Sequence, residues 1–142
     1  MDINLEKKIA KALLYKNKQE RFLFERSKKN RMDVIFKLPN MIDESLCMME
    51  STTFPPPEVI IKIMKSYGVE DKCYVLSEYE DFDGVCVSLR SAVDKLQWNG
   101  FPSLIVGLPS GFSHFKNESY ASNQPNYFLK PNVRFDGALW NT

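Results

Sequence analysis

The residue types that build metal centres and disulfide frameworks are scarce in this chain. Its three cysteines, Cys47, Cys73 and Cys86, are odd in number and widely spaced, and its single histidine is His114. A structural zinc site needs several close ligands, and a disulfide framework needs cysteines that pair. The sequence therefore predicts no metal, no disulfide and no cofactor, a pattern typical of a reducing compartment.

Long apolar runs are also missing. No run approaches the roughly 18 residues that a membrane span needs, and the first thirty residues are too rich in Lys, Arg and Glu for a secretory signal. We therefore expect a cytoplasmic protein without a membrane partner. At 142 residues, two domains would each bury too small a core, so residues 1–142 are expected to form one domain.

Charge is distributed unevenly, although the formal net charge is only +1. Residues 1–31 hold ten Lys and Arg against four acids, whereas residues 32–142 hold nine Lys and Arg against fourteen acids. A basic segment on an otherwise acidic protein is compatible with nucleic-acid binding. However, Glu6, Glu20 and Glu25 interrupt the basic segment, and no recognised nucleic-acid motif is present. Nucleic-acid binding therefore stands as an alternative function, and we do not expect it.

Three segments predict helices. Residues 3–29 contain no Gly or Pro, which predicts a basic N-terminal helix, either as one long element or as two pieces. A second helix is expected to begin near Glu58, behind three consecutive prolines, and to stop at Gly68. A third is expected over residues 89–97, with Ser88 as its cap.

The β-branched and aromatic content of further segments predicts strands. These segments are residues 32–38, 73–77, 101–108, 112–116 and 127–129. Residues 42–50 predict a short helix or a loop, and Trp140 is expected to hold the C-terminal tail against the body. The elements together predict an α/β or α+β domain: one sheet of about four or five strands, flanked by helices, with a long N-terminal helix.

One segment invites comparison with a catalytic motif. A nucleophile elbow has the pattern G-x-S-x-G between a strand and a helix, whereas Gly107–Gly111 reads G-x-x-S-G between two predicted strands. A hairpin turn is the favoured interpretation. His114 could act as a base for Ser110 or Cys86 only with a third, orienting group, and the sequence singles none out. We therefore expect no enzyme.

Acidic and aromatic residues alternate after the strand at 73–77. The residues are Glu78, Tyr79, Glu80, Asp81, Phe82 and Asp83. Four acids on one turn are expected to be solvated and to repel one another, without the apolar surroundings that prepare a carboxylate for acid-base catalysis. Two interpretations stay open: the loop keeps the protein in solution, or it binds a partner by charge steering and aromatic anchoring.

Residues 73–130 resemble a group of small bacterial immunity proteins, which are encoded beside the toxins of contact-dependent growth-inhibition and related polymorphic systems. The segments that carry the resemblance are Cys73–Ser77, Asp83-Gly84, Ala92-Val93, Asn99–Phe101, Ile105 and Pro109–Gly111. The resemblance implies a cytoplasmic protein that binds one cognate toxin domain, commonly a nuclease, and blocks it. It implies no catalytic residues.

The leading hypothesis is therefore an immunity protein that neutralises a toxin domain by direct binding, with Glu78–Asp83 as the partner-binding residues. The free protein is expected to be monomeric. The alternative is a nucleic-acid-associated regulator that uses the basic N-terminal helix. An enzyme built on Ser110 or Cys86 with His114 is a third class.

Overall fold

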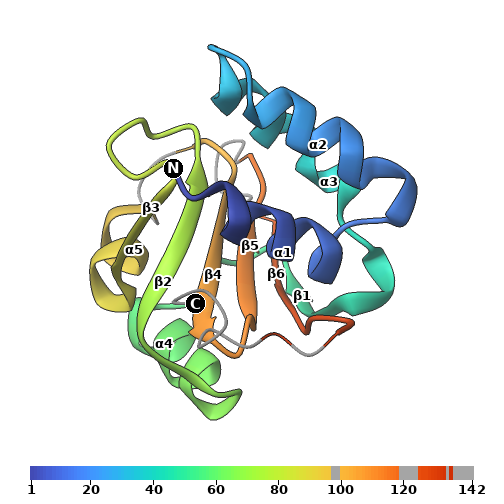
Figure 1. Ribbon diagram of the computed structural model, residues 1–142. Helices are drawn as coiled ribbons and strands as arrows, with labels where there is room; N and C mark the ends of the chain where they lie inside the picture. The colour runs from blue at the N-terminus through green and yellow to red at the C-terminus, as the bar shows by residue number, and fades with distance from the viewer. Residues whose placement is uncertain (97–99, 119–124, 134, 136–142) are drawn as a thin grey trace.

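One antiparallel sheet organises the chain in the computed structural model, which describes residues 1–96, 100–118, 125–133 and 135 (Figure 1). The strand order is β1-β6-β5-β4-β2-β3. The strands are β1 (Cys47–Ser51), β2 (Val69–Ser77), β3 (Val85–Ser88), β4 (Ser103–Pro109), β5 (Ser113–Lys116) and β6 (Asn126–Leu129). Trp140 lies outside the described residues.

Helices pack on both faces of this sheet, and the fold is α+β because every strand pair is antiparallel. The α-helices are α1 (Ile3–Leu13), α2 (Gln19–Arg26), α3 (Leu38–Met41), α4 (Pro57–Ser66) and α5 (Leu89–Leu96). Three 3₁₀ helices are interspersed: η1 (Lys16–Lys18), η2 (Arg31–Lys37) and η3 (Glu44–Leu46). The predicted helices near Glu58 and over 89–97 are confirmed as α4 and α5.

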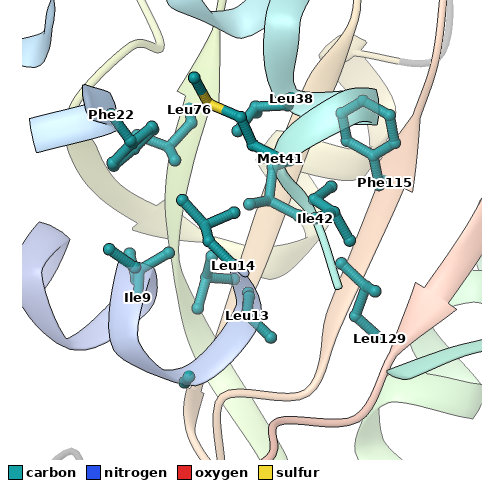
Figure 2. Packing of buried hydrophobic residues seen from close by; sticks show 14 of the residues in the cluster. Ile9, Leu13, Leu14, Phe22, Leu38, Met41, Ile42, Leu76, Phe115 and Leu129 are labelled. Carbon is teal, nitrogen blue, oxygen red and sulfur yellow. The ribbon is translucent and has the colours of Figure 1, made fainter. Parts of the chain in front are cut away.

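The helices divide the hydrophobic core into two layers. Tyr74 and Leu76 of β2 pack under the layer of α1, α2, η2 and α3, and Figure 2 shows Leu76 among the side chains of that layer. Cys73 and Val75 of β2 face α4 and α5 instead. Because both faces are covered, the central strand β4 is apolar without alternation, as its sequence predicts.

The N-terminal segment is two α-helices rather than one long one. At Leu14 the backbone is extended and forms a β-bridge with Ile42. The amide of Tyr15 donates to the Met41 carbonyl at 2.9 Å, and the amide of Asp43 donates to the Leu13 carbonyl at 2.9 Å. Residues 41–43 therefore form hydrogen bonds with the backbone groups that a continuous helix would have paired internally.

Residues 32–38 do not form the predicted strand. Most of this segment is η2, in which Val34 and Ile35 are buried while Asp33 and Phe36 are exposed. Leu38, one turn after Val34, is also buried. The burial pattern is helical, so packing against the sheet overrides the strand propensity of the β-branched residues.

The sheet has six strands rather than the predicted four or five. The first additional strand, β1, lies within the segment expected to be a short helix or loop. It pairs with β6 through Cys47 opposite Leu129 and Met48 opposite Phe128. The second, β3, ends at Ser88, the residue predicted to cap the next helix. Both are edge strands, whose partly exposed residues give little sequence signal.

A buried ion network joins the N-terminal helices to the sheet. The guanidinium of Arg26 contacts the Glu6 carboxylate at 2.7 Å and the Asp83 carboxylate at 3.1 Å. Arg31 pairs with the other oxygen of Asp83 at 3.0 Å, and the Tyr74 hydroxyl donates to Glu6. The side chains of Arg26, Glu6 and Asp83 are almost fully buried. The expectation that all four loop acids are solvated is therefore wrong for Asp83.

Removing the charge of Asp83 leaves Arg26 buried with incomplete compensation. We expect Asp83→Asn to lower the free energy of unfolding by about 3 kcal/mol, because breaking a buried ion pair leaves an uncompensated charge. Urea denaturation measures the change. Asp81→Asn is the matched control: its side chain is exposed in the same loop, so we expect a change within about 0.5 kcal/mol. Equal denaturation midpoints for the two variants would contradict the prediction.

Candidate functional site

The loop between β2 and β3 is shaped by its own backbone. The Tyr79 carbonyl accepts hydrogen bonds from the amides of Phe82 and Asp83, at 2.9 and 3.1 Å. The Asp83 carboxylate accepts from the amide of Ser77 at 3.1 Å. Gly84 follows with a φ of 71°, a conformation that glycine adopts without strain. The loop is thus held at both ends, and its tip is presented in a fixed shape.

The six residues predicted to bind a partner lie in different environments. Tyr79 is 39% exposed, and Glu80 and Asp81 are exposed beside it. Phe82 is half-buried and packs against the core under α4 and α5, with its ring centroid 5.7 Å from that of Tyr79. Only Tyr79, Glu80 and Asp81 are therefore fully presented at the surface.

Glu78 is half-buried at the start of the loop. Its Oε1 atom is buried without a hydrogen-bond partner among the described residues. Burial raises the pKa of this carboxyl, and the nearby charges of Asp33 and Asp83 raise it further. The effect of Asp33 shows that η2 contributes negative charge to the same region as the loop.

Two aromatic residues missed by the sequence reasoning extend this region. Phe36 of η2 is 39% exposed and Phe101 is 50% exposed. Their rings meet edge to face, with centroids 6.4 Å apart. In a 3₁₀ helix, residues three apart lie on one face, so Asp33 and Phe36 point the same way. The predicted strand would have placed them on opposite faces, and no sequence signal corrects this.

These residues form one surface, which we call the acidic–aromatic surface. Its members are Asp33, Phe36, Glu78, Tyr79, Glu80, Asp81 and Phe101. Its three rings and four carboxylates come from η2, the β2–β3 loop and the segment just before β4. The Phe36–Phe101 ring contact, the Arg31–Asp83 ion pair and the pairing of Ser77 with Ser103 bring these three segments together.

A cleft of about 690 Å³ opens on the same side of the sheet as α3. Ile42 and Phe115 contribute apolar surface to it, and Glu44 and Glu50 contribute carboxylates. Burial, followed by the charges of Glu50 and Glu44, raises the pKa of the Cys47 thiol in this cleft to about 11. A thiol with that pKa is protonated at neutral pH and is a poor nucleophile.

The basic N-terminal segment borders a smaller cleft of about 310 Å³. Lys18, Arg21 and Lys37 line it together with the side-chain amides of Asn17 and Asn40. Glu25 is bound to Lys37 at 2.8 Å and to Arg21 at 3.1 Å, and the Lys37 hydrogen bond is the main cause of the lowered pKa of Glu25. This acid neutralises part of the cationic surface.

The register of the sheet separates Cys86 from His114. Cys86 pairs with Tyr74, Tyr74 with Val106, and Val106 with Ser113. Residues paired across strands point to the same face, and the next residue along a strand points to the other. His114 follows Ser113, so it lies on the opposite face from Cys86, with β2 and β4 between their strands.

His114 is buried and lies beside Asn126. It is 1% exposed, and its Nε2 atom lies 3.2 Å from Oδ1 of Asn126. The Asn126 amide group donates to the carbonyls of Ser51 and Thr53, so Oδ1 is left to accept and Nε2 carries the proton. Burial lowers the pKa of His114 to about 4, which keeps the ring neutral at pH 7.

The segment Gly107–Gly111 is a hairpin turn, which confirms the favoured interpretation. The amide of Gly111 donates to the carbonyl of Gly107 at 2.8 Å, and the Ser110 hydroxyl accepts from the amide of Phe112 at 3.3 Å. A Cβ atom on Gly107 would lie 2.3 Å from a methyl group of Val69. Close packing, rather than catalysis, accounts for glycine at this position.

No group of three or more His, Cys, Asp and Glu side chains lies close enough to hold a metal ion in the part of the chain that the structure describes. Within the same residues, no helix has the length and apolar character to cross a bilayer.

Comparisons of the chain with models of protein families, with curated proteins and with solved structures find no match.

The buried histidine should make the protein sensitive to acid. His114 has a pKa of about 4 when folded against 6.5 as an ordinary histidine, so the unfolded chain binds the proton first. As the pH falls from 6.5 to 4, we expect this residue to cost about 3 kcal/mol of stability. Urea denaturation across that range measures the loss.

The control for this pH dependence is His114→Gln, which retains an amide donor for Asn126 and does not titrate. Its stability should fall less steeply over the same range, because the carboxyl groups contribute equally in both proteins. Parallel profiles for the two proteins would show that His114 is not the acid-sensitive group.

Proposed function

We propose that this protein is a cytoplasmic immunity protein that binds a basic toxin domain, of the nuclease class, through the acidic–aromatic surface. The observation that carries the proposal is the exposure of Tyr79, Phe36 and Phe101 among carboxylates. Aromatic residues are enriched in protein interfaces and among the side chains that dominate binding energy. The surrounding acids select a partner of positive charge.

Charge complementarity supports a nuclease as the partner. A nuclease holds phosphate groups and is therefore basic around its active site, so an acidic surface speeds association with it. The net charge of this chain is only +1, so the attraction is local to the acidic–aromatic surface. Binding at the rim of the active site or at a neighbouring exosite satisfies this charge pattern as well as direct occupation of the site.

The way the loop is anchored also supports binding. Asp83 is fixed by Arg26, Arg31 and the Ser77 amide. Tyr79 and its two acidic neighbours therefore have little conformational freedom to lose when a partner binds. A preorganised surface gains affinity because less conformational entropy is lost on association. A loop that served only to keep the protein in solution would need no such anchoring.

Two sets of substitutions separate steering from anchoring. We expect the reversal of Glu80 and Asp81 to Lys to slow association with the cognate toxin domain that the proposal requires, and to weaken the dependence of that association rate on salt. Tyr79→Ala should instead speed dissociation, at a cost of about 2 kcal/mol. Phe82 is unsuitable for this test because it packs on the core. Surface plasmon resonance at several salt concentrations measures both rates.

The control is the substitution of both Glu70 and Asp71 by Lys. These two acids are also exposed, but they lie near the start of β2, at the other end of the strand from the loop. We expect these changes to leave both rates close to those of the original protein. Unchanged rates for the loop variants would exclude the loop as the interface. Absence of a complex, together with absence of growth protection, would exclude the immunity function itself.

The smaller cationic cleft is the observation that favours the nucleic-acid alternative. That alternative predicts oligonucleotide binding that weakens steeply with salt, and a greater loss for the double variant Lys18→Gln, Arg21→Gln than for Lys7→Gln, Lys11→Gln. Both pairs remove two exposed positive charges, but only the first lines the cleft. Fluorescence anisotropy with a labelled oligonucleotide measures this, and a flat titration at low salt would exclude the alternative.

A further inference from the structure

The larger cleft lies where the helical layer stops. Figure 2 shows Ile42 directly beside Phe115 at the end of the packed core, next to Leu129 of β6. Beyond Ile42 the chain turns through η3 into β1, and residues of α3, η3, β1, β5 and β6 line the space between them. A hollow of about 690 Å³ remains there, large enough for one side chain and part of the segment that bears it.

The cleft combines an aromatic floor with a negative rim. Phe115 and Tyr127 meet edge to face with ring centroids 5.4 Å apart, and Phe115 is fully buried beneath the opening. Glu44 and Glu50 are exposed at the rim. No Lys, Arg or His occurs among the described residues that line the cleft, so its charged lining residues in that part of the chain are the two carboxylates.

The negative potential acts inside the cleft. Cys47 is one of the residues that line it, and burial, followed by the charges of Glu50, Glu44 and Asp43, raises the pKa of its thiol. Charges on a low-dielectric wall act strongly on a group placed in the cleft. The same field that disfavours a thiolate stabilises a cation.

We infer that this cleft receives an arginine side chain presented by the partner protein. A guanidinium group is planar and weakly hydrated, stacks on aromatic rings, and donates paired hydrogen bonds to carboxylates. Tyr127 offers the ring, and Glu44 and Glu50 offer the carboxylates. A lysine ammonium satisfies the charge but neither stacks nor binds a carboxylate in this forked geometry.

The position of the cleft agrees with the proposed interface, on which this inference rests. Pro39 lines the cleft and lies three residues after Phe36 on the helical run of η2 and α3, so the cleft begins about one helical turn from the acidic–aromatic surface. A basic partner that covers Phe36 and Phe101 can place an arginine in the cleft without a second binding event.

The test uses the full chain and a small probe instead of the toxin. We titrate ¹⁵N-labelled protein with N-acetyl-arginine amide and follow the amide signals of Cys47, Asn117 and Tyr127. N-acetyl-citrulline amide is the control ligand because it has nearly the same shape without the charge. We expect saturable shifts of these signals with the arginine probe and at least about tenfold weaker binding of the citrulline probe.

A variant pair ties the binding to the cleft. Glu44→Gln with Glu50→Gln should weaken arginine binding about tenfold, whereas Glu58→Gln with Glu70→Gln removes two exposed acids outside the cleft and should leave it unchanged. All four side chains are exposed, so the folds should persist, and thermal denaturation checks this. Equal binding of the two probes, or equal effects of the two variant pairs, would overturn the inference.

The outcome is distinguishable from that of the toxin experiment. If the toxin domain binds through the loop and the arginine probe does not bind, the inference about the cleft fails while the proposed function stands. If the probe binds the cleft and the toxin domain forms no complex, the proposed function fails and the cleft remains a guanidinium site.

Discussion

The buried guanidinium of Arg26 is the contact on which the rest of the structure depends. It lies in α2, and its partners come from α1 through Glu6 and from the β2–β3 loop through Asp83. A charge this deeply buried is tolerated only when it is paired and hydrogen-bonded on every side. The helical layer, the sheet and the loop must therefore come together before the buried charges of Arg26, Glu6 and Asp83 are all paired. The position of the acidic–aromatic surface is a consequence of that requirement.

Elements stabilised by their own sequence could be predicted, and those stabilised by distant partners could not. The central strand β4 and the helices α4 and α5 carry local signals, namely an apolar run, a proline start and a serine cap. The break at Leu14 depends on a bridge to Ile42, and β1 depends on pairing with β6. The 3₁₀ helix η2 shows the same effect, because its β-branched residues follow the packing surface rather than their propensity.

The candidate site was predictable in composition but not in arrangement. The alternation of acids and aromatics identifies the loop, yet nothing in the sequence distinguishes Asp83 from Asp81. One is enclosed by two arginines and the other is exposed, although they lie two residues apart. The contribution of Asp33 and Phe36 could not be predicted for a related reason. These two residues share a face only if their segment is helical.

Burial of the ion network also changes what the net charge means. Arg26 and most of Arg31 are withdrawn from the surface with Glu6 and Asp83, so these charges cancel inside the protein and contribute little to the field that a partner meets. Lys37, the cation nearest in sequence to Phe36, is paired with Glu25. The carboxylates of Asp33, Glu78, Glu80 and Asp81 lie on the same surface as Phe36 and Tyr79. A chain of formal charge +1 thus carries a local cluster of negative charge.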